Sequence, residues 1–240
     1  MLKKLTERIY FLPGEKRTDR PYLYYINGDT MSLAVDAGNS KWHVEKFYHE
    51  LKEHGFRKPA YTVLTHWHWD HTFGMHAVTG KTIASVLTNQ KLREVQNWEW
   101  TEQKMREREE RGEDIAFCNQ CILCEYENLG DITVIPADIE LKEKVEINLG
   151  GIHCVLEPHD STHSRDSLFL YIPEEKVLVV GDSDCEDYYG DGKYDRDRLL
   201  DLIAYIKSFD FTTYLIGHDV PRSRKEAMDF LHSQLEMVSV

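Results

Sequence analysis

The stretch Thr65-His66-Trp67-His68-Trp69-Asp70-His71 carries three imidazoles and one carboxylate within a single short segment. It comes directly after Tyr61-Thr62-Val63-Leu64, an apolar run that predicts a short buried strand. Ligand sites in open sheets gather at the carboxyl ends of strands, and imidazole and carboxylate are ligands suited to zinc. One ion takes three or four protein ligands, so four candidates here indicate either a crowded site or two ions.

Three further candidate ligands, His163, Asp182 and His218, each follow the end of a predicted strand. Asp182 and His218 are each separated from their strand by a single glycine. Taken alone, a histidine in such a place is more often a hydrogen-bonded loop residue than a ligand. Together with the first motif, the three residues predict a single site at which the strand ends converge.

The order and spacing of these motifs resembles the metallo-β-lactamase-fold superfamily over nearly the whole chain. The segments that match its motifs are 66–71, Pro158-His159-Asp160-Ser161-Thr162-His163, Gly181-Asp182 and Gly217-His218. In the second segment the later histidine corresponds to the ligand. The resemblance implies an α/β fold, a four-layer αββα sandwich. It also implies one ion held by His66, His68 and His163, a second held by Asp70, His71 and His218, and Asp182 as the bridge between them.

The chain departs from the family pattern in one motif and from the true β-lactamase subclasses in another. Ser161-Thr162 stands where the family usually has Pro-Gly, and the aspartate at 182 argues against the true β-lactamase subclasses. Residues 89–131 resemble an insertion, which we expect to form a helical lid or interface element, with one long polar helix from Thr88 to about Arg111. We take residues 1–240 as a single domain.

Regular helices are predicted elsewhere in the chain. Ser40 can cap a helix that runs to about Glu53, and two further helices are predicted at 196–207 and 224–237. Within the insertion, Trp98 and Trp100 lie two apart on the predicted long helix and should face in different directions.

The resemblance further implies a zinc-dependent hydrolase with two divalent ions, iron or manganese being the alternatives to zinc. Its substrate would be a small ester, thioester, lactone or amide, attacked by a metal-bound hydroxide. Asp70 is expected to accept the proton of the water as well as to bind metal. Tyr188 and Tyr189 are candidate catalytic residues, because a tyrosine after the bridging aspartate holds the substrate oxygen in lactonase-like relatives. Asp36 either orients a histidine or is a turn residue.

Four other functions stay open. Two use the same fold: a mononuclear iron dioxygenase that oxidises sulfur, and a phosphodiesterase. A serine hydrolase could use Gly181-Asp182-Ser183-Asp184-Cys185 as a nucleophile elbow, although the final glycine is missing and the histidines are left unexplained. A non-catalytic zinc scaffold is disfavoured by the full ligand set, because a structural site is usually one closed ion.

Composition limits the partners. The formal net charge is -13, which repels a phosphate backbone, so we expect no nucleic-acid partner. No apolar stretch approaches the ~20 residues of a membrane span. We find no export signal at the start of the sequence, and the cysteine count of five is odd, so we expect reduced thiols and a cytoplasmic protein. A small-molecule substrate is the expected partner, and a homodimer is left open.

Three of the cysteines form Cys118-x-x-Cys121-x-x-Cys124. On a helix this spacing makes one stripe, and free cysteine packs as a small apolar side chain. Packing is therefore the favoured interpretation, and an additional metal or a redox pair are the alternatives.

Overall fold

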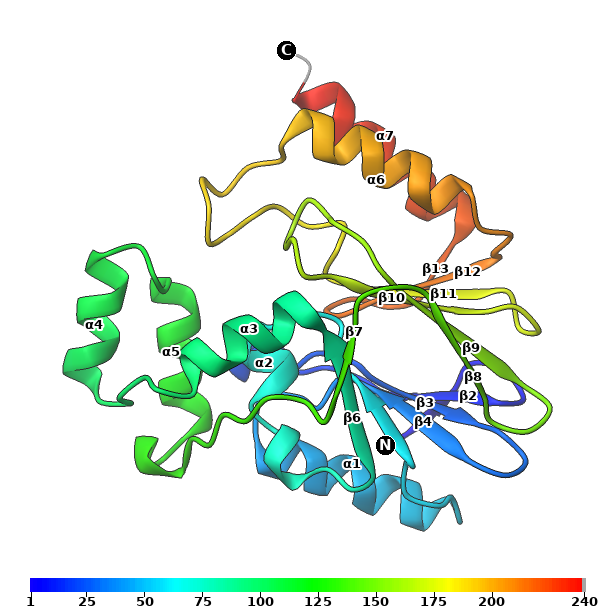
Figure 1. Cartoon of the computed structure of the whole chain (residues 1–240), viewed down its shortest axis with the longest axis horizontal. Helices are drawn as coiled ribbons and strands as arrows, with labels where there is room; N and C mark the ends of the chain where they lie inside the picture. The colour runs from blue at the N-terminus through cyan, green and yellow to red at the C-terminus, as the bar shows by residue number, and fades with distance from the viewer. Residues whose placement is uncertain (239–240) are drawn as a thin grey trace.

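The computed structural model describes residues 1–238 and arranges them in four layers, with two β-sheets face to face and helices on both outer sides (Figure 1). This is the predicted αββα sandwich. The first sheet has the order β1-β2-β3-β4-β5-β6-β7, with β1 (Lys3–Lys4), β2 (Ile9–Leu12), β3 (Leu23–Asn27), β4 (Ser32–Val35), β5 (Tyr61–Val63), β6 (Lys81–Ser85) and β7 (Ile139–Leu141). The second has the order β13-β12-β11-β10-β9-β8, with β8 (Val145–Asn148), β9 (His153–Pro158), β10 (Leu168–Ile172), β11 (Val177–Gly181), β12 (Thr213–Ile216) and β13 (Arg222–Ser223).

The helices cover the outer faces of the sheets and also build the insertion. They are α1 (Lys41–Glu53), α2 (Trp69–Thr72), α3 (Val86–Val95), α4 (Glu102–Glu110), α5 (Ala116–Glu125), α6 (Arg196–Lys207) and α7 (Arg224–Met237), with short 3-10 turns η1 (Lys16–Thr18), η2 (Met75–Ala77) and η3 (Leu129–Asp131). In Figure 1, α6 and α7 lie over the second sheet, whereas α1 lies on the far side of the first. Among residues 1–238, no helix combines the length and apolar character needed to cross a membrane.

The alternation of side chains along the strands builds the layers. In β4, Leu33 and Val35 enter the core between the sheets, and Ala34 packs on the opposite side in the cluster that contains Phe47 of α1. In β11 every residue is buried, because one face packs on the first sheet and the other on α6 and α7. The strands that lead to the site are therefore held from both sides.

The carboxyl ends of these strands meet at one edge of the sandwich. β4, β5 and β6 run parallel in the first sheet, and β11 and β12 run parallel in the second. Hydrogen bonds tie the sheets together at this edge. The backbone N–H of Leu168 donates to Thr65 O at 2.7 Å, and the buried Tyr24 hydroxyl donates to Ile216 O at 2.6 Å. The strand ends are thus fixed relative to one another.

The prediction of a single helix from Thr88 to about Arg111 was wrong. The chain leaves α3 after Val95 and starts α4 at Glu102. The Thr101 side chain accepts the backbone N–H of Lys104 at 3.2 Å, which makes Thr101 the N-cap of a new helix. α3, α4 and α5 nevertheless make up most of residues 89–131.

The segment between α3 and α4 carries the two tryptophans. The prediction that Trp98 and Trp100 face apart was wrong, because they do not lie on a helix. Their ring centroids are 5.8 Å apart, and the guanidinium of Arg108 lies 4.5 Å and 4.7 Å from the two rings. Arg108 is itself buried beside Asp114. This cluster holds the bend of the insertion in place.

A buried ion pair ties the insertion to the N-terminal part of the chain. Glu125, at the end of α5, accepts from Arg20 at 2.7 Å and 3.2 Å, and its side chain is only 2% exposed. The Ser40 hydroxyl also donates to Glu125, while its oxygen caps α1 by accepting the His43 N–H. One carboxylate therefore joins α5, the segment after η1 and the start of α1.

Replacing Arg20 by alanine is expected to lower the free energy of unfolding by about 3 kcal/mol, because Glu125 would be left as an unpaired buried charge. Urea denaturation at pH 7 measures this effect. Arg17→Ala is the matched control in the same loop, since its side chain is largely exposed and its ion pair is weak. A loss below about 1 kcal/mol for Arg20→Ala would show that the pair does not hold the insertion.

Candidate metal centre

Three histidines converge at the edge where the two sheets meet. His68 Nδ1 lies 3.0 Å from His66 Nε2 and 2.9 Å from His163 Nε2, and all three side chains are buried. His66 and His68 belong to the loop after β5, and His163 belongs to the loop before β10. Their nitrogens lie within 4.8 Å of one another, close enough to share one ion.

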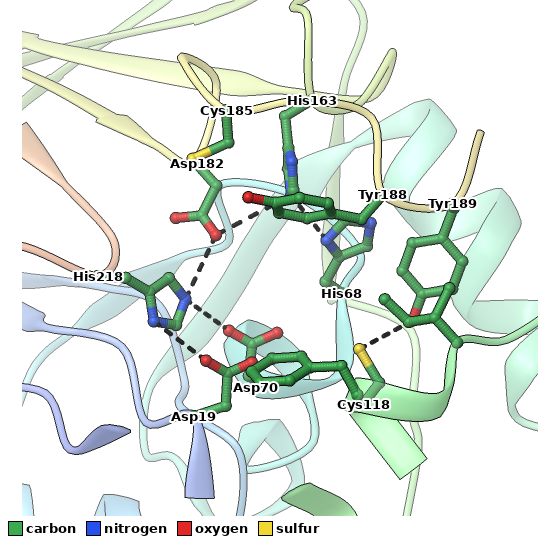
Figure 2. A pocket seen from close by; sticks show the side chains of 12 residues that line it. Asp19, His68, Asp70, Cys118, His163, Asp182, Cys185, Tyr188, Tyr189 and His218 are labelled. Atoms are coloured by element: carbon green, nitrogen blue, oxygen red, sulfur yellow. Dashed lines mark hydrogen bonds and ion pairs between the residues drawn. The ribbon is translucent and has the colours of Figure 1, made fainter. Parts of the chain in front are cut away.

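A second group lies beside the first and contains both acidic ligand candidates. Asp70 Oδ2 lies 2.9 Å from His71 Nε2 and 2.9 Å from His218 Nε2. Asp182 Oδ2 lies 3.4 Å and 3.3 Å from the same two nitrogens. It also lies 3.9 Å from His163 Nε2 of the first group. Asp182 therefore reaches both groups, as Figure 2 shows for His163 and His218.

The two groups differ in electrostatics. Burial, reinforced by neighbouring histidines, lowers the pKa of His66 and His68 well below the usual value, so both rings are neutral. Burial also opposes the charged forms of His71 and His218, but the surrounding carboxylates outweigh it and raise both pKa values. The second group thus concentrates negative charge that favours bound protons, and a divalent cation would neutralise the same charge.

The residues present fit divalent metal ions. His71 Nε2 is buried and makes no hydrogen bond of good geometry, although the carboxylate oxygens of Asp70 and Asp182 lie only 2.9 Å and 3.4 Å from it. Its other ring nitrogen, Nδ1, is held by Asp36 at 2.8 Å. A histidine fixed through one nitrogen with the other left free is the usual arrangement of a metal ligand. Imidazole and carboxylate donors together favour zinc or a similar transition metal.

Two glycines allow the strand ends to approach this closely. A Cβ at Gly217 would lie 2.0 Å from Asp182 Oδ1 and 2.9 Å from His71 Cε1. Gly181 has a φ of 58°, and a Cβ there would meet the Thr65 side chain at 2.6 Å. The glycines before Asp182 and His218 are therefore required by the packing of the site.

A pocket of about 430 Å³ opens onto both groups. Its lining includes ligand candidates from each group and other residues that are mainly apolar. The complete lining consists of Asp19, His68, Asp70, Ile115, Phe117, Cys118, His163, Asp182, Cys185, Tyr188, Tyr189 and His218. Figure 2 shows most of these side chains around the open space. The volume suits a small organic molecule.

The sequence was compared with known proteins. A family profile described as "Metallo-beta-lactamase superfamily" matches residues 38–218. The chain belongs to this superfamily. No curated protein matches the sequence significantly.

Solved structures share the fold of this superfamily member at low sequence identity. A metallo-beta-lactamase from Pontibacter korlensis has a TM-score of 0.69 and 15% identity, covering 100% of this chain and 98% of that one. A metallo-beta-lactamase from Hirschia baltica gives 0.65 and 16%, covering 99% and 96%. The stereoselective inverting sec-alkylsulfatase Pisa1 from Pseudomonas sp. gives 0.70 and 13%, covering 99% of this chain but only 41% of the sulfatase. These likenesses establish the fold alone.

The structure brings together all seven residues that the sequence singled out as metal ligands in this metallo-β-lactamase superfamily member; their role as ligands stays a prediction. The choice of His163 over His159 fits the geometry. The His159 ring stacks on Tyr205 at 3.7 Å and lies outside both groups. Cys118, Cys121 and Cys124 are in neither group among residues 1–238; the first two are buried and the third is exposed.

Tyr188 and Tyr189 both line the pocket, but in different ways. The Tyr188 ring lies 5.6 Å from His163 and its hydroxyl bonds to Glu186 at 3.2 Å. Tyr189 is packed against His68 at 4.7 Å, and its hydroxyl donates to Cys118 Sγ at 3.6 Å. Tyr189 is thus part of the wall, while Tyr188 borders the opening. Their catalytic role stays a prediction.

Asp36 is both things that the sequence allowed, a turn residue and an orienting partner. It adopts a left-handed conformation with φ of 64°, and its carboxylate accepts from Thr65 N and lies 2.8 Å from His71 Nδ1.

Asp36→Asn keeps the shape of the side chain and tolerates the left-handed turn, but it places an amide N–H against His71. We expect metal affinity to fall about 10–100-fold. Competition with a fluorescent zinc chelator measures it, and unchanged affinity would contradict the role.

Asp19 is a site residue that sequence reasoning missed. It follows η1 with φ of 51°, and its Oδ1 lies 3.5 Å from His218 Nδ1. Burial, together with the charge of Asp70, raises the pKa of Asp19 to about 7. Figure 2 shows it beside His218 on the side away from Asp182. No motif marks this aspartate, and only the tertiary contact between η1 and the end of β12 reveals it.

Proposed function

We propose that this chain is a dinuclear metal-dependent hydrolase that acts on a small ester, thioester, lactone or amide. The observation that carries the proposal is the pair of adjacent ligand groups that share access to Asp182 and open onto one pocket. A structural ion would be enclosed by its ligands, whereas here His68, Asp70 and His163 line a cavity large enough for a substrate.

Two divalent ions bound in these groups would supply an activated water at neutral pH and polarise the substrate oxygen. The protein's own residues set the geometry. His71 and His218 hold the pKa of the Asp70 carboxylate well below its usual value, against the effect of burial, so Asp70 is ionised. It borders the pocket and can accept a proton from the attacking water. Asp36 fixes the ring of His71 from behind.

Zinc is the metal we propose, with iron or manganese as alternatives. One ligand group consists of imidazoles alone and the other combines imidazole with carboxylate, and both sets of donors suit zinc. The presence of two groups also favours hydrolysis over a mononuclear iron dioxygenase. We propose a reducing compartment such as the cytoplasm, since all five cysteines are free thiols. We also propose that no nucleic acid is bound.

The geometry disfavours the serine hydrolase. Ser183 is buried, and its hydroxyl donates to Val180 O at 2.6 Å instead of facing the pocket. A nucleophile elbow would expose this hydroxyl to the substrate.

The test is hydrolysis of a panel of esters, thioesters, lactones, amides, β-lactams and phosphodiesters by metal-loaded protein before and after chelation. Wild-type protein is expected to cleave at least one acyl substrate, and chelation should stop it. His68→Ala should be inactive, and His159→Ala is the matched control because that ring lies outside both groups. Activity that survives chelation, or turnover of phosphodiesters alone, would overturn the proposal.

A further inference from the structure

The pocket has two chemically different sides. One side consists of the ligand candidates. The other consists of Ile115, Phe117 and Cys118 at the start of the insertion helix α5 together with Tyr188 and Tyr189 after β11. No lysine or arginine lines the pocket among residues 1–238. The part of a substrate that extends away from the reacting bond would therefore meet an apolar, aromatic wall.

Two of the wall residues are the aromatic members of the exposed large apolar side chains among residues 1–238. Phe117 is 56% exposed and Tyr188 is 49% exposed, although both border a pocket. Leaving aromatic surface in water is unfavourable, and a bound apolar group between the two would cover it. Both rings are therefore available to contact the apolar part of a substrate.

Three cationic side chains in the insertion and in the N-terminal part of the chain are engaged in other contacts. Arg108 is held by Trp98 and Trp100, and Lys91 lies over the Trp67 ring at 5.1 Å. Arg20 is paired with the buried Glu125. The one acidic side chain of the lining outside the ligand groups is Asp19, which offers an anionic substrate no positive partner.

We propose that the pocket selects small substrates whose group beyond the reacting bond is apolar and uncharged, held between Phe117 and Tyr188, and that it discriminates against substrates with an anionic group there. This inference rests on the proposed hydrolase function and adds the substrate class. An anionic group against this wall would lose its hydration without gaining a partner.

The test uses two esters of equal acyl length, 4-nitrophenyl butyrate and mono-4-nitrophenyl succinate, with rates corrected for spontaneous hydrolysis. Wild-type kcat/KM is expected to be at least about tenfold higher for the butyrate. Phe117→Arg places a cation in the wall and should lower the ratio of kcat/KM for the butyrate to kcat/KM for the succinate at least about fivefold. Leu123→Arg is the matched control: Leu123 is on the same helix, 44% exposed, and outside the pocket.

A binding measurement separates this inference from the hydrolase proposal. Calorimetry of metal-loaded protein with butyranilide and with succinanilate, the anilide counterparts of the esters, reports selectivity without turnover. The inference is supported if butyranilide binds more tightly than succinanilate and if Phe117→Ala, but not Leu123→Ala, weakens the binding of butyranilide. This holds even if neither ester is cleaved, because the absence of cleavage would contradict only the hydrolase proposal. Equal or tighter binding of succinanilate, or no binding of either anilide, overturns the inference.

Discussion

Replacing Asp182 by alanine is expected to lower the bound metal clearly below two ions per chain and to lower kcat/KM about a thousandfold. Asp182 is the carboxylate within 4 Å of nitrogens from both groups, at 3.3 Å from His218, 3.4 Å from His71 and 3.9 Å from His163. Loss of a residue that only orients a ligand costs about 10–100-fold, so loss of a group shared by two ions should cost more. Metal analysis and steady-state kinetics on the same preparation measure both effects.

Asp182→Asn guards against misfolding as the explanation, because it preserves shape and removes only the charge. Asp219→Asn is the matched control, since Asp219 follows His218 but is exposed, lies outside both groups and is held by Val220 N and Arg222. We expect Asp182→Asn to resemble Asp182→Ala and Asp219→Asn to resemble wild type. A folded Asp182→Ala protein with two ions and undiminished activity would refute the shared role.

Removing the metal is expected to destabilise the fold by about 4 kcal/mol when the loaded protein is compared at a free metal concentration a thousandfold above Kd. For a chain of this size the melting temperature should fall by about 10 °C. The physical reason is the charge left behind: Asp36, Asp70 and Asp182 are all buried around His71. A bound cation compensates these carboxylates, and its removal leaves only protons to do so.

Thermal unfolding after dialysis against a chelator, and again after zinc is restored, measures the metal contribution to stability. Asp182→Ala serves as the comparison, because its melting temperature should respond much less to zinc. An unchanged wild-type melting temperature with and without metal would mean that the ligand groups do not bind ions in the folded state.

The parts of the fold that the sequence predicted well are those with strong local signals. α6 and β12 begin and end where the apolar pattern placed them, at Arg196–Lys207 and Thr213–Ile216. Local caps explain this agreement: Asp195 accepts two backbone N–H groups at the start of α6, and Ser223 forms a capping box with Glu226 at the start of α7. The metal-ligand candidates were predictable because each follows a strand end.

The features that were missed depend on tertiary contacts. β6 and β7 pair in parallel in the first sheet, but β7 is only three residues long, too short for its alternation of apolar and polar residues to predict a strand. The break before Thr101 is stabilised by Arg108 between two tryptophans, which no helical periodicity reports. Asp19 reaches His218 only because η1 packs at the end of β12, across almost the whole length of the chain.

The central claim is that two adjacent groups of side chains each hold a metal ion. The most direct measurement is elemental analysis of the purified wild-type chain after loading with zinc and removal of free metal, with protein quantified by amino-acid analysis. The account predicts two ions per chain, falling clearly below two in both His68→Ala and Asp182→Ala. A wild-type chain that retains no ion would contradict it.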